Sequence, residues 1–556
     1  MKETYFSVRL AVLFLALIFS NRSFSQNTST FFGFNAWMGA QVGSSMLFGD
    51  LDNILTTANS PLSNSAGGAL QARMYRLGGK EFDIQFLTQS ELFSTMSGSV
   101  TTALSNGLEP IFTIPVAAGL LWYWNNVSNT PADVINNVMT SANLLNPSTG
   151  NQYYNDVNGL VTNIVNSVLS SRPNRYYIIG NEPDKWGGYN NLNSKFYDLG
   201  CSSCNITTDV AIIARYTKTI AEWIRAIDPN AIIIGPELAW HHFDANNPGM
   251  FNQLCDINDL PNNIFVSSIA NPGKVDIGSF HSYNWPKDDP NTPGWQAQPW
   301  TKQDVIDFPR NQGAGSLYNL LGDMLNWLSA NGPTYDGQLA ITEFNLGFEN
   351  EIADGKQDES MNSFIAGQYW AECFSIGRYY DWGWWSQVFG IWPWSVKEGM
   401  GAGDLGMIDN AFDRRSTYFH LQMVAKEFSR GRVQLLTSVS TNGAGKAFGV
   451  RDCQGGAVMI TNQGNTTESY YYSLDGAAPL GYAEIGNINM DWTDKFVTSD
   501  NVLLTNSLGD IGPMETHLYR LNPCGEVIYS YEYNDGDYIN DLPPVETSFA
   551  GSGCVC

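Results

Sequence analysis

Short apolar runs alternate with longer stretches of helical pattern from Phe31 to about Arg430. In the longer stretches, such as 208–228 and 360–380, apolar residues recur at the three- and four-residue spacing of an amphipathic helix. The short runs have the length and the residue content of strands, so the alternation predicts a (β/α)8 TIM barrel. We expect its eight strands in the runs FFGFNAW (from Phe31), ARMYRLGG (Ala72), EPIFTIPV (Glu109), RYYIIGNEP (Arg175), AIIIGPE (Ala231), VDIGSFHSY (Val275), QLAITEFN (Gln338) and DWGWWSQ (Asp381).

The pattern changes after a helix-like segment that starts at Ser416. From Val433 to Leu521, short β-rich runs are separated by Gly, Asn and Asp, which favours a smaller all-β sandwich. The segment that follows is acidic and has little apolar pattern, so we expect it to be loosely ordered. The predicted organisation is a barrel over 26–430, a β-sandwich over 431–523 and an acidic tail over 524–556.

Residues 1–25 have the pattern of a signal peptide. A basic start precedes an apolar run from Leu10 to Phe19, which is too short to span a bilayer. Small residues at Ser23 and Ser25 suit a cut before Gln26. We therefore expect a secreted, extracellular protein without a membrane span.

Charge and composition narrow the range of partners. The formal net charge of −25 disfavours binding to nucleic acid or to an anionic membrane, and a neutral ligand fits better. The chain holds 17 Trp, 26 Tyr and 29 Phe, and flat aromatic faces are what sugar rings stack against. Its eight cysteines permit disulfides without forming the main scaffold; Cys453 and Cys524 could bracket the sandwich, and the connectivity stays open. We expect a monomer and no bound cofactor.

Two glutamates come directly after predicted strands. In a β/α barrel, residues at the carboxyl ends of the strands face the active site. Glu182 ends the fourth run in the sequence GNEP, where Pro183 stops the strand and Asn181 offers an amide that could bind a sugar hydroxyl. Glu343 ends the seventh run. Strands four and seven lie on opposite sides of an eight-stranded barrel, so we expect the two carboxylates to face each other across the pocket.

These motifs resemble the glycoside hydrolases of clan A, a group of retaining β-glycosidases and endoglycanases. The resemblance covers roughly Phe31 to Arg430, and it implies that Glu182 is the acid/base and Glu343 the nucleophile. The run YRLGGKEFD from Tyr75 is similar to the heparanase and β-glucuronidase family and to arabinofuranosidase-like members. This second likeness implies that Arg76 lies beneath the nucleophile.

The chemistry of a retaining enzyme needs two carboxylates about 5–5.5 Å apart. One attacks the anomeric carbon, while the other protonates the leaving oxygen and then activates water. We expect Arg76 to keep Glu343 ionised, while a less solvated Glu182 retains its proton longer. An inverting enzyme would instead need a separation above about 6.5 Å.

Other residues are candidates for contact with the substrate. The sixth run places His281 and Tyr283 on one face, and the resemblance implies that Tyr283 hydrogen-bonds the nucleophile. Sugar contact by His281 and simple core packing stay open as alternatives. We expect Trp384 or Trp385, after the eighth strand, to form a platform under the sugar, and Trp186 to lie at the rim.

Glu237 follows the fifth run, close to His241 and His242, but their spacing matches no usual metal-ligand pattern. We therefore expect Glu237 to belong to a loop or to contact the substrate, and we expect no metal. The leading functional prediction is hydrolysis of a β-linked polysaccharide or oligosaccharide. An exo-acting β-glycosidase or β-glucuronidase is the alternative enzyme, and a non-catalytic carbohydrate-binding protein is the alternative of another class.

Overall fold

The computed structural model of the chain describes most of the predicted strands and the segments around them. The described residues are 31–36, 72–77, 100–101, 103–105, 107–116, 147–185, 210–239, 243, 249–266, 273–283, 309, 316–331, 338–346, 363–381, 388–393, 406–409, 413–429, 432–436, 445–452, 455–475, 488–491 and 502–551.

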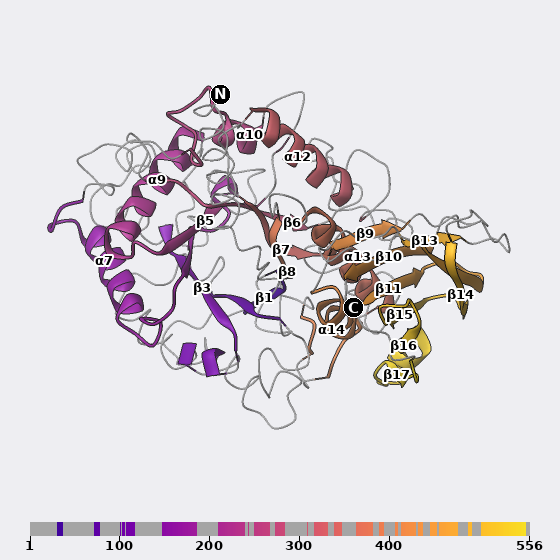
Figure 1. Ribbon diagram of the computed structural model, residues 1–556. Helices are drawn as coiled ribbons and strands as arrows, with labels where there is room; N and C mark the ends of the chain where they lie inside the picture. The colour runs from indigo at the N-terminus through magenta and orange to yellow at the C-terminus, as the bar shows by residue number, and fades with distance from the viewer. Residues whose placement is uncertain are drawn as a thin grey trace, which may run out of the picture.

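Eight parallel strands form one sheet in the order β1 to β8, with every neighbour in sequence also a neighbour in space. Phe32 forms a parallel bridge with Ile391, so the first and last strands meet and the sheet closes into a barrel (Figure 1). This confirms the predicted fold class. The strands are β1 Gly33–Ala36, β2 Met74–Leu77, β3 Glu109–Ile114, β4 Arg175–Ile179, β5 Ala231–Leu238, β6 Ile277–Tyr283, β7 Gln338–Asn345 and β8 Val388–Pro393.

The position predicted for the eighth strand is wrong. The run DWGWWSQ was expected to be a strand, but Asp381 caps the preceding helix and β8 begins only at Val388. The physical reason is that VFGIWP can fill the barrel, with Ile391 and Trp392 fully buried, whereas the aromatic run before it directly follows the end of a helix. Trp384 and Trp385 therefore precede β8 in the chain.

Helices cover the outside of the barrel (Figure 1). Helix α9 follows the helical spacing of its apolar residues, and it buries Ile213, Tyr216, Ile220 and Ile224 on one face. The described helices of this region are α7 Gln152–Val165, the short 3-10 turn η3 Pro183–Lys185, α9 Val210–Ile227, α10 Met250–Cys255, α12 Leu317–Asn331, α13 Phe364–Tyr380 and α14 Ser416–Glu427.

The barrel interior has an apolar floor beneath its polar mouth. Side chains from seven of the strands pack together there, with Trp392 as the largest. A Cβ atom at Gly33 or Gly390 would lie within 2.7 Å of the indole ring of Trp392, so both strands need glycine at these positions. The remaining members of this cluster are Met74, Ile111, Ile178, Ile234, Ile277 and Ala340.

Antiparallel strands follow the barrel. One sheet has six strands in the order β17-β16-β15-β11-β10-β9, and a second has three in the order β13-β12-β14. Ile511 of the smaller sheet packs against Ala447, Val458 and Ile460 of the larger one, which is the layering of a sandwich. The strands are β9 Arg432–Leu436, β10 Gly445–Asp452, β11 Gly455–Asn462, β12 Glu468–Asp475, β13 Ile488–Asp491, β14 Val502–Ile511, β15 Glu515–Leu521, β16 Val527–Asn534 and β17 Val545–Ser548.

The other face of the six-stranded sheet packs on helices α13 and α14, which lie between the barrel and the sheet in Figure 1. Residues Phe364 to Arg378 of α13 are buried all round the helix because the barrel covers one side and the sheet the other. A buried ion pair crosses this contact, with Lys446 Nζ 2.8 Å from Glu372 Oε2. Thr461 donates a second hydrogen bond of 2.9 Å to Glu372.

The prediction of a loosely ordered tail is wrong for the described part of 524–556. This part contains strands β16 and β17, which are the last two strands at one edge of the six-stranded sheet. The short helix α15 Asp535–Ile539 lies between them in the chain. Tyr531, Tyr533 and Tyr538 are buried, so tyrosines provide the apolar surface that the acidic composition conceals. Cys524 is disulfide-bonded.

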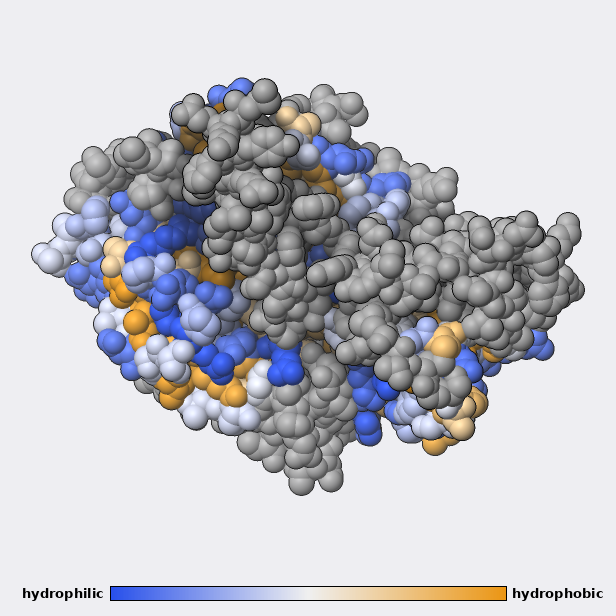
Figure 2. Space-filling view, viewed as in Figure 1, coloured by the Kyte–Doolittle hydropathy of each residue, from blue (hydrophilic) through white to orange (hydrophobic). Residues whose placement is uncertain are grey.

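Two observations concern the surface. The described helices include none that is long and apolar enough to cross a membrane. Four large apolar side chains are exposed between residues 539 and 549, namely Ile539, Leu542, Val545 and Phe549. Figure 2 shows orange atoms at the lower right, where Figure 1 places β16 and β17.

Candidate active site

Glu343, near the end of β7, contacts a cation and a hydroxyl. Arg76 donates from Nη1 to Glu343 Oε1 in a short ion pair, and Tyr283 donates a 2.7 Å hydrogen bond to Glu343 Oε2. Burial, and then the charge of Glu343, raises the pKa of Tyr283 well above its usual value, so the phenol keeps its proton and acts as the donor. Both oxygens of the carboxylate therefore accept a hydrogen bond.

Glu182 follows β4 with a left-handed backbone. Its φ angle is 47°, after a glycine, Gly180, with φ 73°. A left-handed non-glycine residue costs about 1–2 kcal/mol and persists only where its surroundings impose it. The Glu182 N–H donates a 2.8 Å hydrogen bond to the Glu237 carbonyl, and Asp184 in η3 accepts 2.8 Å from the Ala239 N–H. These bonds tie the end of β4 to the end of β5.

The carboxylates of Glu182 and Glu343 lie close together. One oxygen of each, together with a ring nitrogen of His281, form a group whose atoms all lie within 4.8 Å of one another. The Glu182 side chain is 10% exposed and that of Glu343 is 7% exposed. Both groups are therefore largely shielded from water, and each keeps a small exposed surface.

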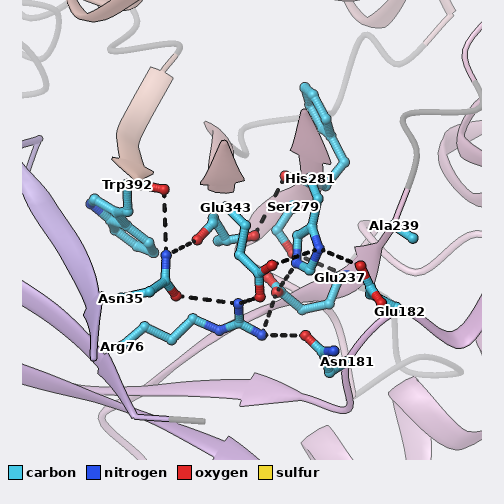
Figure 3. Close-up of polar contacts among 12 residues, drawn as sticks. Asn35, Arg76, Asn181, Glu182, Glu237, Ala239, Ser279, His281, Glu343 and Trp392 are labelled. Carbon is cyan, nitrogen blue, oxygen red and sulfur yellow. Dashed lines mark hydrogen bonds and ion pairs between the residues drawn. The ribbon is translucent and has the colours of Figure 1, made fainter. Parts of the chain in front are cut away.

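Arg76, on β2, links the groups of the site (Figure 3). Its Nη2 donates 2.6 Å to the side-chain oxygen of Asn181 and lies 3.1 Å from Glu237 Oε2. Burial by itself lowers the pKa of Arg76, but the charges of Glu237 and Glu343 outweigh it and raise the pKa above its usual value. The guanidinium is a fixed positive charge beneath two carboxylates.

His281 lies among three carboxylates. Its Nδ1 is 3.1 Å from Glu182 Oε1 and 3.3 Å from Glu343 Oε2, while its Nε2 is 3.1 Å from Glu237 Oε2. Burial by itself lowers the pKa of His281, but the charge of Glu343 and the hydrogen bonds with Glu182 and Glu237 raise it to about 9. The ring is therefore an imidazolium at neutral pH.

Glu237 is not a loop residue. It lies within β5, its side chain is fully buried, and its Oε2 contacts both Arg76 and His281. Burial by itself raises the pKa of Glu237, but the charge of Arg76 and the hydrogen bond from His281 outweigh it and lower the pKa below its usual value. Sequence reasoning missed this role because the run IGPELAW resembles the exit of a strand into a loop.

Asn35, on β1, is a second residue that sequence reasoning missed. Its amide donates 2.8 Å to the Thr342 carbonyl and 3.1 Å to the Pro393 carbonyl, which ties β1 to β7 and β8. Its side-chain oxygen accepts 3.3 Å from Arg76 Nη1. The signal was a single amide in the apolar run FFGFNAW, and the sheet register pairs this residue with Arg76.

The structure thus brings six of the predicted residues into one cluster. They are Arg76, Asn181, Glu182, His281, Tyr283 and Glu343. Trp186, Trp384 and Trp385 lie outside the described residues. Trp392, on β8, packs in the barrel floor, and Phe389 of the same strand packs against it.

Glu182, His281 and Glu343 are close enough together to hold a metal ion. A histidine ligand must be neutral, so a metal ion would have to displace the His281 proton that the surrounding carboxylates stabilise. The Arg76 cation also already occupies Glu343. The donor set suits proton transfer and charge stabilisation better than metal binding.

No family model and no curated protein matches the chain. Solved structures similar to it include a Paenibacillus polymyxa xyloglucanase of glycoside hydrolase family 44, at 13% identity over 83% of this chain and 95% of that one, with a TM-score of 0.47. A family 39 glycoside hydrolase from Bacteroides cellulosilyticus WH2 shares 12% identity over 87% and 80% of the two chains, with a TM-score of 0.47. A family 39 β-xylosidase from Caulobacter crescentus shares 14% identity over 89% and 97%, with a TM-score of 0.44. None of these likenesses assigns an activity or a residue to this chain.

Proposed function

We propose that the chain is a secreted, monomeric retaining glycoside hydrolase that cleaves a β-linked polysaccharide or oligosaccharide. The observation that carries this proposal is the pair of carboxylates, Glu182 and Glu343, with oxygens within 4.8 Å of each other at the carboxyl ends of barrel strands. Retaining enzymes hold their carboxyl groups about 5–5.5 Å apart, and inverting enzymes about 6.5–9.5 Å apart. A nearest-oxygen distance within 4.8 Å is compatible with the retaining spacing.

The two carboxylates have different surroundings, which suits different roles. Glu343 accepts from Arg76 and Tyr283, so it is suited to attack the anomeric carbon as an anion. Glu182 protonates the departing glycosidic oxygen, which leaves as a hydroxyl. Glu182 then takes a proton from water, and the hydroxide attacks the glycosyl-enzyme ester, which restores the free Glu343 carboxylate. Asn181, held by Arg76, is placed to bind a sugar hydroxyl next to Glu182.

The β-glucuronidase alternative would require a cation for the carboxylate of the sugar. Arg76 does not provide one, because it is fully buried and already paired with Glu237 and Glu343. Glucuronidase activity would therefore depend on another basic residue. The alternative of an exo-acting neutral β-glycosidase requires no such cation.

A glycan panel with product sizing tests the proposal. We expect the wild type to release products from at least one β-linked substrate, with β-anomers formed first in a proton NMR time course. Glu343→Gln, which keeps the size of the side chain and removes its charge, should abolish release. An activated 2-fluoro glycoside should label Glu343 covalently, as detected by peptide mass spectrometry. Binding of glycans without any hydrolysis would contradict the enzyme and favour a carbohydrate-binding protein, and α-anomers formed first would contradict retention.

A further inference from the structure

The two sides of the His281 ring differ. The Nδ1 side faces Glu182 and Glu343, whose side chains keep some exposure, while the Nε2 side faces Glu237, whose side chain has none. A ligand entering the site can thus reach Glu182 and Glu343 but cannot reach Glu237. Whatever the Glu237 side chain contributes must pass through the residues that it touches, which include His281, Arg76 and Ser279.

The geometry also constrains the protons of the ring. Carboxylate oxygens accept hydrogen bonds, and both ring nitrogens of His281 lie 3.1 Å from a glutamate oxygen. Neutral imidazole has only one N–H, so it would turn a lone pair towards one of these oxygens, whereas imidazolium donates from both nitrogens. The Glu237 carboxylate provides an acceptor for Nε2–H that stays in place whatever happens on the other side of the ring.

We propose that Glu237 is a positioning residue for the hydrolysis, which holds His281 as an imidazolium whose Nδ1–H donates to Glu182 and Glu343. This inference rests on the proposed function for its catalytic meaning. The charges in the cluster are consistent with it, because the cations Arg76 and His281 lie against the anions Glu237 and Glu343.

The consequence for the reaction concerns Glu182. When Glu182 gives its proton to the leaving oxygen, it becomes a carboxylate in a nearly dry site, where an unpaired charge is costly. The Nδ1–H of the imidazolium lies 3.1 Å from Glu182 Oε1 and stabilises this charge as it forms. Without Glu237, the ring would lose an anionic partner and would more readily become neutral.

The ionisable groups around His281 come from every described strand packed on it. They are Glu182 after β4, Glu237 on β5, Glu343 on β7 and, on its own strand β6, Tyr283, with a ring centroid 6.4 Å away. Arg76 on β2 contacts Glu237 and Glu343. Burial by itself lowers the pKa of His281, but the neighbouring carboxylates outweigh this effect and raise the pKa to about 9. Removal of the Glu237 charge should lower this pKa.

Histidine NMR of the full chain tests the inference without relying on activity. The chain has 5 His, so ring signals labelled at Cε1 can be assigned with a His281→Gln variant. We expect His281 to titrate near pH 9 in the wild type, and about 1–3 pH units lower in Glu237→Gln. A wild-type midpoint below pH 7, or an unchanged midpoint in Glu237→Gln, would overturn the inference. If Glu237→Gln does not fold, the wild-type titration midpoint still tests the inference by itself.

The pH profile of kcat/KM gives the second readout. In Glu237→Gln the alkaline limb should shift, because the charge state of His281 acts on the acid Glu182, whereas a purely structural role would lower activity equally at every pH. Glu372→Gln is the matched control, because it also neutralises a fully buried, ion-paired glutamate, but between α13 and β10. It should reduce stability and leave the limb in place. If the wild type hydrolyses nothing, the proposed function fails, and the NMR titration still decides the role of Glu237.

Discussion

The backbone N–H of Glu182 donates a 2.8 Å hydrogen bond to the backbone carbonyl of Glu237. Both residues have left-handed backbones, with φ of 47° and 59°. This hydrogen bond joins two strained residues at the ends of neighbouring strands, and it fixes the direction in which the Glu182 side chain leaves the backbone. The position of the proposed acid/base thus depends on a residue that no ligand touches, since the Glu237 side chain is fully buried.

Replacement of Glu182 by Gln should separate the two chemical steps. The amide keeps the shape but cannot give a proton, so kcat for a glycan substrate should fall by about 10²–10⁴-fold. With an aryl leaving group that needs no protonation, formation of the glycosyl-enzyme should fall much less, and the burst of released phenol in stopped-flow measurements should persist. An equal loss for both leaving groups would contradict the role of acid.

Replacement of Tyr283 by Phe removes the 2.7 Å hydrogen bond to Glu343 and keeps the aromatic ring. A hydrogen bond to a charged group contributes about 1.5–3 kcal/mol, so kcat/KM should fall by about 10- to 100-fold. Tyr153→Phe is the control, since it removes a buried tyrosine hydrogen bond of 3.1 Å to the Pro115 carbonyl, outside the site. Equal activity losses in the two variants would show that Tyr283 acts only through stability.

Much of this site follows from strand patterns in the sequence. Glu182 lies shortly after the apolar run of β4, and Glu343 ends the apolar run within β7. The barrel brings the ends of such runs together, so local pattern and closure suffice to place them. The alternation of His281 and Tyr283 in β6 likewise places both on the inner face. These predictions needed only the period of a strand and the direction of the barrel.

The roles of Glu237 and Asn35 depend on contacts that span the barrel. The role of Glu237 depends on its contacts with Arg76 and His281, which are remote in sequence. The pattern of residues within β5 does not predict these contacts. The error in the position of β8 has a related cause. The sequence offers two adjacent aromatic-rich runs, DWGWWSQ and VFGIWP, and the difference between them is the packing of Trp392 in the barrel floor, which the local pattern does not contain. The prediction of a loosely ordered tail was wrong because it was based on average composition. The acidity of the segment does not indicate where its buried tyrosines, such as Tyr531, occur.

Replacement of Arg76 by Met should destabilise the fold as well as abolish activity. It leaves the carboxylates of Glu237 and Glu343 without their shared cation, and breaking a buried ion pair from one side costs about 3–5 kcal/mol. Urea unfolding followed by fluorescence should show this loss. The double variant Arg76→Met with Glu237→Gln removes one of the stranded charges and should recover part of the stability. A double variant less stable than Arg76→Met alone would contradict this account of the cluster.

His420, far from these carboxylates, should make stability depend on acidity. The fully buried ring contacts the Ser416 carbonyl at 2.8 Å through Nδ1 and the Thr516 hydroxyl at 2.9 Å through Nε2. The carbonyl can only accept, so Nδ1 carries the proton, and neutral Nε2 accepts from the hydroxyl. Burial lowers the pKa of His420 to about 4, despite the opposing hydrogen bond to Ser416.

The sign of the effect follows from proton binding. The pKa of histidine in an unfolded chain is about 6.5. Between that pH and about pH 4, the unfolded chain therefore binds more protons than the folded one. The contribution of His420 is therefore fully present above about pH 6.5 and is lost as the pH falls towards 4, by about 3 kcal/mol in total. Urea unfolding of wild type and His420→Gln across this range measures it, since carboxylates elsewhere titrate alike in both. The difference between the two free energies of unfolding should shrink with acidification, and a constant difference would show that folding does not lower the pKa of His420.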